Sequence, residues 1–356
     1  MHAAAQIMRF TPIAVCLFAF LPALAEAAST PSLAWTRLPD IPDREGFAGS
    51  HAGVTGGALL VAGGANFPHK RPWEGGTKVW HDKAFLLEPG AVAWRTVERL
   101  PAAGGYGVSV TLDEGVLLIG GGDAHQNFST VWLVRWDGRQ LSYIAWPALP
   151  RPLALMAGAR VGRTIYVAGG LERPEATRAS HAAYRLDLDA RDKGWQELPA
   201  WPGPERILSV GGAQGDAFYL FSGARLVADA TGKITREWLR DAYRFTPAGG
   251  WQRLADLPRV AVAAPALAPL VQGKLLVLGG DDGAQLGVDP TAHRGFPRDM
   301  LAYDPDANTW SRTGEMPFSL VTTSLAIWRG QLVVPGGEAR PGVRSTQVWA
   351  APFSGR

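Results

Sequence analysis

The stretch Val116-Leu117-Leu118-Ile119-Gly120-Gly121-Gly122 joins an apolar run to consecutive glycines. Such a run predicts a buried strand, and the glycines allow the backbone to turn sharply where the strand ends. The pattern recurs along the 356-residue chain, and successive glycine pairs are 49 to 57 residues apart. The other copies occupy residues 58–64, 164–170, 217–223 (with Ser222-Gly223 in place of two glycines), 274–280 and 331–337. Six copies of one pattern indicate a repeat architecture.

A second signature alternates with the first, in which a tryptophan is followed by an apolar residue and then a proline. Its six copies run from Trp35 to Pro39, Trp94 to Pro101, Trp136 to Pro150, Trp195 to Pro199, Trp251 to Pro258 and Trp310 to Pro317. A repeat of this length that contains several strands is typical of a propeller blade. We therefore predict an all-β fold, a six-bladed β-propeller, with the tryptophans packed between blades.

The two ends of the chain are out of phase with the repeat. Trp35 precedes the first glycine pair, whereas the last pair, Gly336-Gly337, is followed by only one further strand. The N-terminal strand near Trp35 is therefore expected to complete the sixth blade, which would close the ring and leave no open sheet edge. On this interpretation residues 29–356 form a single propeller domain.

The composition agrees with many short strands joined by turns. The chain has 43 glycines and 27 prolines, it is 47% hydrophobic, and only 19% of its residues are charged, which excludes a disordered chain. The net charge is +3, and no segment gathers lysine and arginine. Nucleic-acid binding therefore has little electrostatic support.

Residues 1–28 are expected to be a secretory signal peptide. Arg9 precedes an apolar core, and Ala23-Leu24-Ala25 supplies the small residues of a cleavage site. The core is too short for a good membrane span, although an uncleaved anchor is the alternative. Cys16, the only cysteine, lies in this core, so a mature chain would have no thiol for a disulfide, for catalysis or for metal binding. We expect a periplasmic protein if the source is Gram-negative, with no membrane contact after cleavage.

The paired glycines, followed by spaced tyrosines and tryptophans, resemble Kelch blades. This resemblance covers nearly the whole of the expected mature chain, but it implies only a fold. Propellers carry both enzymes and binding modules, so the function has to come from the site.

The residues that follow the glycine pairs differ between repeats and are expected to meet at one face of the ring. There they would form a polar cup suited to a small polar ligand such as a sugar, the alternative being a solvated rim of loops. Its expected members are Asn66, Asp123, Arg173, Arg225 and Asp282, together with His69 and Lys83 from the aromatic and charged loop at 66–83.

The last repeat carries a carboxylate and guanidinium groups in one tight loop. A glutamate such as Glu338 can act as a general base, and an arginine such as Arg344 can bind a substrate carboxylate through two hydrogen bonds. A structural salt bridge between the two is the alternative.

The same loop, Gly336-Gly337-Glu338-Ala339-Arg340-Pro341-Gly342-Val343-Arg344, resembles a G-E-A-K/R-P-G-x-R loop of bacterial N-acetylneuraminate epimerases, the sialic acid mutarotases. Tyr106-Gly107-Val108-Ser109 and Met300-Leu301-Ala302-Tyr303-Asp304-Pro305 also match that family. The order of blades differs, because the blade with Glu338 comes last, so the chain resembles the cyclically permuted members over residues 34–352. A closed ring tolerates such a permutation.

The resemblance implies that Glu338 is the catalytic acid/base and that Arg344 binds the substrate carboxylate. The implied reaction interconverts the α and β anomers of free N-acetylneuraminate by ring opening and closure, with no metal or organic cofactor. The implied partner is therefore a small acidic sugar.

Three other functions make different demands on the sequence. A copper radical oxidase would need a cysteine crosslinked to a tyrosine, and the expected mature chain has no cysteine. A sialidase would need repeated Asp boxes, which residues 306–310 match only in part. A non-catalytic carbohydrate- or protein-binding propeller is the main alternative, and it predicts that Glu338 is dispensable.

Overall fold

Six four-stranded antiparallel sheets make up the fold of the computed structural model, which describes His2 and residues 33–353. Apart from His2, the predicted signal peptide lies outside the described residues. Blade 1 contains β2 (His51–Thr55), β3 (Ala58–Ala62), β6 (Ala84–Leu87) and β7 (Arg95–Val97). Blade 2 contains β8 (Val108–Leu112), β9 (Gly115–Ile119), β10 (Val131–Trp136) and β11 (Leu141–Trp146). Blade 3 contains β12 (Ala157–Val161), β13 (Thr164–Ala168), β14 (Ala183–Asp187) and β15 (Gln196–Leu198).

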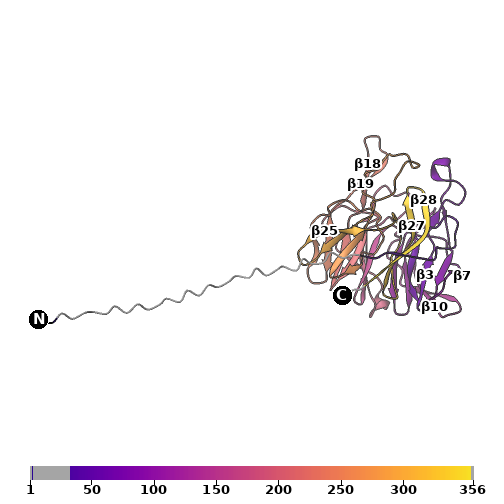
Figure 1. The fold of residues 1–356 in the computed structure, drawn as a ribbon, viewed down its shortest axis with the longest axis horizontal. Helices are drawn as coiled ribbons and strands as arrows, with labels where there is room; N and C mark the ends of the chain where they lie inside the picture. Colours follow the sequence, from indigo (N-terminus) through magenta and orange to yellow (C-terminus); the bar gives the residue numbers. More distant parts are fainter. Residues whose placement is uncertain (1, 3–32, 354–356) are drawn as a thin grey trace. The chain divides into compact units, whose positions relative to one another are not determined.

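Blade 4 contains β16 (Val210–Gln214), β17 (Ala217–Phe221), β20 (Ala242–Thr246) and β21 (Gly250–Arg253). Blade 5 contains β22 (Leu270–Val271), β23 (Lys274–Leu278), β24 (Asp299–Asp304) and β25 (Thr309–Glu315). Blade 6 contains β26 (Ala326–Trp328), β27 (Gln331–Arg340), β28 (Val343–Pro352) and β1 (Thr36–Leu38). The predicted all-β, six-bladed propeller is thus confirmed, and Figure 1 shows its strands.

The ring closes as the phase of the repeats predicts. β1 pairs antiparallel with β28, with Thr36 opposite Ala350 and Leu38 opposite Val348. The outermost strand of blade 6 therefore comes from the beginning of the described propeller, while its other three strands come from the end.

Two short hairpins are added to the blades. β4 (Ala65–Asn66) pairs with β5 (Val79–Trp80), and the loop between them contains the 3-10 helix η1 (Pro72–Glu74). β18 (Ala224–Ala228) pairs with β19 (Ile234–Trp238), and this hairpin protrudes at the upper side of Figure 1. A second 3-10 helix, η2 (Arg191–Lys193), connects strands of blade 3. No helix among the described residues is long and apolar enough to cross a membrane.

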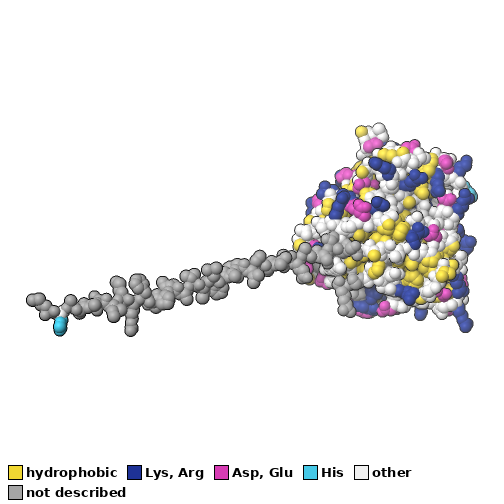
Figure 2. Space-filling view, in the orientation of Figure 1, with side chains coloured by type: hydrophobic (Ala, Val, Ile, Leu, Met, Phe, Trp, Pro, Cys, Tyr) yellow, Lys and Arg dark blue, Asp and Glu magenta, His cyan; other side chains and the backbone are white. Residues whose placement is uncertain are grey.

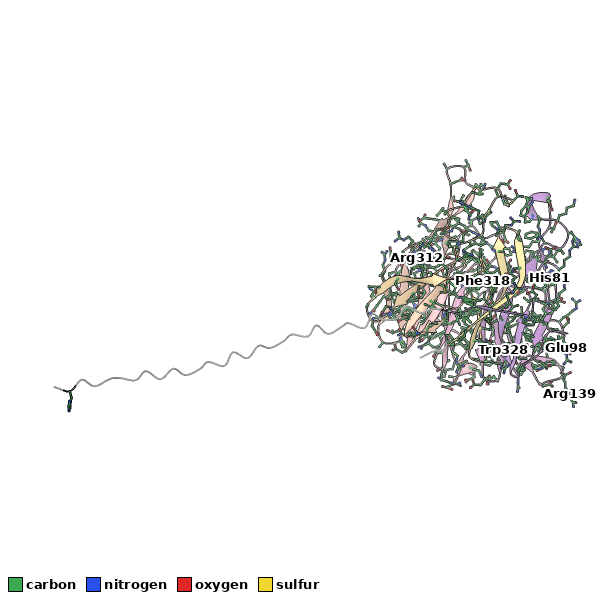
Figure 3. The ribbon with its side chains drawn as sticks, in the orientation of Figure 1. His81, Glu98, Arg139, Arg312, Phe318 and Trp328 are labelled. Atoms are coloured by element: carbon green, nitrogen blue, oxygen red, sulfur yellow. The ribbon has the colours of Figure 1, made fainter. Side chains whose placement is uncertain are left out.

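Tryptophan indoles connect neighbouring blades, as predicted. Four tryptophans, each in an outer strand or directly before it, donate their Nε1–H to a backbone carbonyl of the preceding blade. The pairs are Trp94 with Pro39 (2.7 Å), Trp195 with Pro147 (2.8 Å), Trp251 with Pro199 (2.6 Å) and Trp310 with Ala255 (2.9 Å). Trp328, labelled in Figure 3, makes a similar bond from β26 to Gly57 of blade 1, at 2.8 Å.

Blade 2 departs from the expected pattern. Trp136 lies on its third strand, β10, and the outer strand β11 instead ends with Trp146. Both indoles are buried, so each still contributes to the packing of the blade.

Charged side chains of both signs are intermixed over the visible face in Figure 2.

The innermost turns form a feature that the repeats do not reveal, which we call the axial ring. One residue just before the first strand of each blade donates its N–H to the carbonyl of its counterpart in the preceding blade, at 2.7–2.8 Å, so that six bonds close a circle. Its members, all with φ between +54° and +71°, are Gly49, Tyr106, Leu155, Leu208, Ala263 and Thr322. This left-handed conformation costs a non-glycine residue roughly 1–2 kcal/mol. The interblade hydrogen bonds offset part of that cost.

Candidate active site

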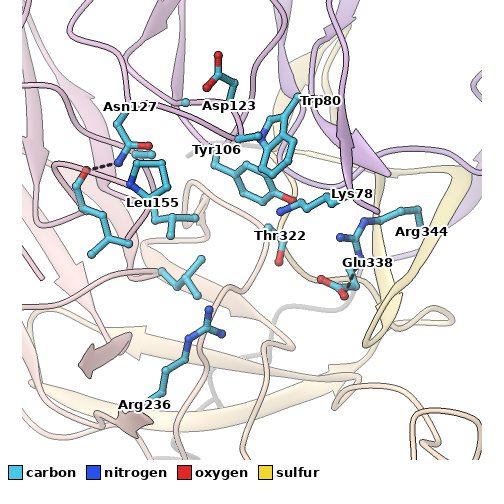
Figure 4. A pocket seen from close by; sticks show the side chains of 17 residues that line it. Lys78, Trp80, Tyr106, Asp123, Asn127, Leu155, Arg236, Thr322, Glu338 and Arg344 are labelled. Atoms are coloured by element: carbon cyan, nitrogen blue, oxygen red, sulfur yellow. Dashed lines mark hydrogen bonds and ion pairs between the residues drawn. The ribbon is translucent and has the colours of Figure 1, made fainter. Parts of the chain in front are cut away.

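A cavity of about 360 Å³ lies on the side of the axial ring where the loops after the glycine pairs gather. Four axial-ring residues form its floor: Tyr106, Leu155, Leu208 and Thr322. Its polar and aromatic walls include Lys78, Trp80, Asp123, Asn127, Arg236, Glu338 and Arg344 (Figure 4). We call this cavity the Glu338 pocket. Its volume suits a monosaccharide-sized ligand.

The long hairpin of β27 and β28 brings Glu338 to the pocket. Glu338 lies directly opposite Arg344 in the strand register, so the two side chains can meet. Gly337, at φ +114°, redirects the chain just before Glu338, and a Cβ there would lie 2.7 Å from the Val321 carbonyl oxygen. The glycine pair of this blade is therefore required for the position of Glu338 as well as for the turn.

Two groups bind one oxygen of the Glu338 carboxylate. The Gly342 N–H donates to Oε1 at 2.7 Å, and Nη1 of Arg344 lies 2.6 Å from the same atom. Within the described part of the chain, no hydrogen bond engages Oε2. The side chain is 19% exposed, so the carboxylate is fixed yet still open to the pocket.

Arg344 is held in place on several sides, and its side chain is only 4% exposed. Its Nε donates to the Ala65 carbonyl at 3.2 Å, and its guanidinium carbon lies 5.1 Å from the Phe67 ring centroid. The close contact of Nη1 with Glu338 is off the hydrogen-bond axis, and Nη1 has no aligned acceptor among the described residues. This guanidinium is thus a rigid cation beside the carboxylate.

Lys78 enters the pocket just before β5. Its Nζ lies 4.2 Å from the Tyr106 ring centroid and 4.6 Å from that of Trp80, which are cation–π distances. Burial and the nearby guanidinium of Arg344 lower the pKa of Lys78 to about 8, although the Glu338 carboxylate acts in the opposite direction. Burial also raises the pKa of the Tyr106 phenol, which therefore stays protonated.

Three of the residues expected at the site line the pocket: Glu338, Arg344 and Asp123. Asp123 Oδ1 accepts the backbone N–H groups of His125 (2.7 Å) and Gln126 (2.9 Å), so this carboxylate stabilises its own loop. Figure 4 shows it on the side of the pocket away from Glu338.

The other six expected cup residues do not line the pocket. Asn66 is buried behind it and hydrogen-bonds to His81 at 2.8 Å, while Lys83 pairs with Asp43 at 2.7 Å. Arg173 pairs with Glu175 (3.4 Å), Arg225 pairs with Glu237 (2.7 Å), Asp282 accepts the Ala284 N–H (3.0 Å), and His69 is exposed.

The strand geometry explains this separation. In every blade the residue directly after the glycine pair bridges to the axial segment, as Glu338 does to Val321. The side chain of the residue after that one is directed to the opposite face, because side chains alternate along extended backbone. The equivalent positions are Ala65, Gly122, Leu171, Ala224, Asp281 and Glu338. Arg225 and Asp282 each follow this position by one residue and do not line the pocket. Asp123 follows it by one residue too, and its carboxylate lines the pocket while it accepts hydrogen bonds from its own loop.

Comparisons with known proteins point to one family. A family model described as N-acetylneuraminate epimerase matches residues 25–143 and 146–288. An N-acetylneuraminate epimerase of Yersinia enterocolitica is 30% identical over 237 residues, which is 59% of this chain and 58% of that protein. One from Haemophilus influenzae is 37% identical over 123 residues, 30% of this chain and 32% of its own length. The chain thus matches less than two thirds of these relatives, and Glu338 and Arg344 lie outside the family match.

A solved structure described as that of YjhT superimposes with a TM-score of 0.62. It is 15% identical and covers 87% of this chain and 96% of its own, so it supports the fold alone. The family model, by contrast, matches most of the chain. This chain therefore belongs to the N-acetylneuraminate epimerase family.

Proposed function

We propose that this protein is a mutarotase that interconverts the α and β anomers of free N-acetylneuraminate. The observation that carries the proposal is the pairing of Glu338 with the buried Arg344 at the wall of a sugar-sized pocket. Family membership supplies the substrate class, since the relatives are named for acting on N-acetylneuraminate.

The walls and floor of the pocket suit such a ligand. The aromatic rings of Trp80 and Tyr106 and the apolar side chains of Leu155 and Leu208 offer faces against which a sugar ring can pack. The fixed guanidinium of Arg344 offers charge for the sugar carboxylate.

In the proposed reaction, Glu338 removes the proton from the anomeric hydroxyl. The electron pair of that O–H bond forms the carbonyl, and the bond between the anomeric carbon and the ring oxygen breaks. The ring oxygen gains a proton, the open chain rotates about one bond, and closure on the other face gives the second anomer. No group is oxidised or reduced in these steps.

The test compares the wild type with Glu338→Gln by proton NMR, following the decay of the pure α anomer of N-acetylneuraminate. We expect Glu338→Gln to lose roughly 10²–10⁴-fold in kcat while it keeps the fold. Glu315→Gln, which changes an exposed surface carboxylate, is the matched control. A wild type no faster than spontaneous exchange would refute the mutarotase, and sugar binding without rate enhancement would favour the non-catalytic alternative.

We also propose that the protein is exported to the periplasm, on the strength of the signal pattern in residues 1–28. Expression of the full chain in a Gram-negative host provides the test. Intact mass measurement of the periplasmic protein should show loss of the leader, and recovery of the uncleaved chain from the membrane fraction would contradict the proposal.

A further inference from the structure

Lys78, like Arg236, is a cation of the pocket that no described carboxylate neutralises directly. Its ammonium lies against the Tyr106 and Trp80 rings, and none of the described carboxylates forms an ion pair with it. Arg344, by contrast, has the Glu338 carboxylate 2.6 Å from its Nη1. Figure 4 shows Lys78 on the same side of the pocket as Glu338 and Arg344.

The charged groups around Lys78 come from several elements. Glu338 faces it from β27, Arg344 from β28 and Arg236 from β19. Burial and the two guanidiniums together lower the pKa of Lys78 to about 8, against the attraction of Glu338. Asp123, which also lines the pocket, is directed into its own loop.

Lys78 is therefore the pocket group best suited to give up a proton near neutral pH. A guanidinium keeps its proton throughout this range, which excludes Arg236 and Arg344 as acids. The phenol of Tyr106 holds its proton even more strongly than usual, since burial raises its pKa.

Resting on the proposed function, we infer that Lys78 is a second catalytic residue, whose ammonium protonates the ring oxygen while Glu338 deprotonates the anomeric hydroxyl. The breaking bond leaves its electron pair on the ring oxygen, which takes the proton from Nζ. After ring opening, Glu338 carries one proton and Lys78 is neutral. Closure on the opposite face returns both protons to their starting groups, so the enzyme is regenerated.

Two groups suit this reaction better than one. The proton that leaves and the proton that arrives are on different oxygens of the sugar, and both transfers lower the barrier to ring opening. Glu338 is held by Gly342 and Arg344, so it is not free to move from one oxygen to the other.

The test measures anomer exchange of N-acetylneuraminate against pH for wild type, Lys78→Met and Lys78→Arg. The uncatalysed rate is subtracted at each pH. The wild-type kcat/KM should fall above about pH 8, where Lys78 loses its proton. Lys78→Met should lower kcat by roughly 10²–10⁴-fold with a smaller change in KM. Lys78→Arg should also lose kcat, because a guanidinium does not release its proton in this range, and its residual rate should no longer fall above pH 8.

Lys193→Met, at an exposed lysine of η2, is the matched control and should behave like the wild type. Circular dichroism checks the fold, and Lys78→Arg carries the test if Lys78→Met does not fold. The inference is overturned if either variant keeps kcat within about threefold, or if the fall above pH 8 persists in Lys78→Arg. Those outcomes leave the proposed function intact, whereas an inactive wild type refutes both.

Discussion

Gly342 allows a direct test of how the hairpin tip positions the Glu338 carboxylate. Its φ is +77°, and a Cβ added there would lie 2.7 Å from Cγ and 2.8 Å from Cδ of Pro72, in η1. Its N–H is also the donor to Glu338 Oε1. Gly342→Ala should therefore displace the tip and the carboxylate together.

The magnitude follows from two separate costs. Alanine in the left-handed region costs roughly 1–2 kcal/mol of unfolding free energy, and a clash with a packed neighbour costs a further 1–3 kcal/mol or so. Gly90→Ala isolates the first cost, because Gly90 has φ +80° and a Cβ there would meet nothing within 4 Å. We expect Gly342→Ala to be the less stable of the two by about 1–3 kcal/mol.

The assays are urea unfolding and α-anomer decay by NMR on both variants. Displacement of a catalytic group by about 1 Å can cost roughly 10²-fold, so Gly342→Ala should lose between about tenfold and a hundredfold in kcat. Gly90→Ala should keep the wild-type rate. Equal stability of the two variants, or full activity in Gly342→Ala, would refute the argument that this tip is braced against η1.

Two further predictions concern arginines in ion pairs. Arg344→Lys should raise the KM for N-acetylneuraminate about tenfold or more in steady-state assays, because an ammonium cannot reproduce the planar guanidinium. An unchanged KM would show that Arg344 does not bind the substrate. Arg206, fully buried, pairs with Asp241 at 2.6 Å, so Arg206→Met should cost about 3–5 kcal/mol of unfolding free energy at pH 7. Burial alone would raise the pKa of Asp241, but Arg206 and Tyr243 outweigh it and hold that pKa below its ordinary 3.8. The pair therefore stabilises fully above about pH 4 and progressively less as the pH falls, so urea unfolding should show the gap between wild type and Arg206→Met narrowing at acid pH; a gap independent of pH would contradict this assignment.

The architecture could be predicted from the sequence because every blade repeats the same strand-and-turn pattern. Each blade needs a buried strand that ends in a sharp turn, so the apolar runs with paired glycines recur and can be counted. The ring closure was predictable for the same reason. Trp35 marks an outer strand ahead of the first repeat, and the last repeat is the one that has no outer strand of its own.

The residues of the site were harder to predict, because membership of the site depends on which side chain in each blade faces the axis of the ring. Glu338 directly follows its glycine pair, whereas Arg225 and Asp282 come one residue later and do not line the pocket. Lys78 gave no periodic signal at all. It reaches the pocket because the two-residue strands β4 and β5 fold the intervening loop back, and such short pairings leave no pattern in a sequence.

The axial ring uses up the backbone donors in the floor of the pocket. All six of its N–H groups are already donated to neighbouring blades, so the floor has no backbone donor left for a ligand. Apart from the hydroxyls of Tyr106 and Thr322, the polar groups that can select a substrate then come from the walls, which are loops and hairpins specific to single blades. Substitutions there can change what the pocket accepts without loosening the hub that joins the blades, which separates the evolution of specificity in this protein from the maintenance of its fold.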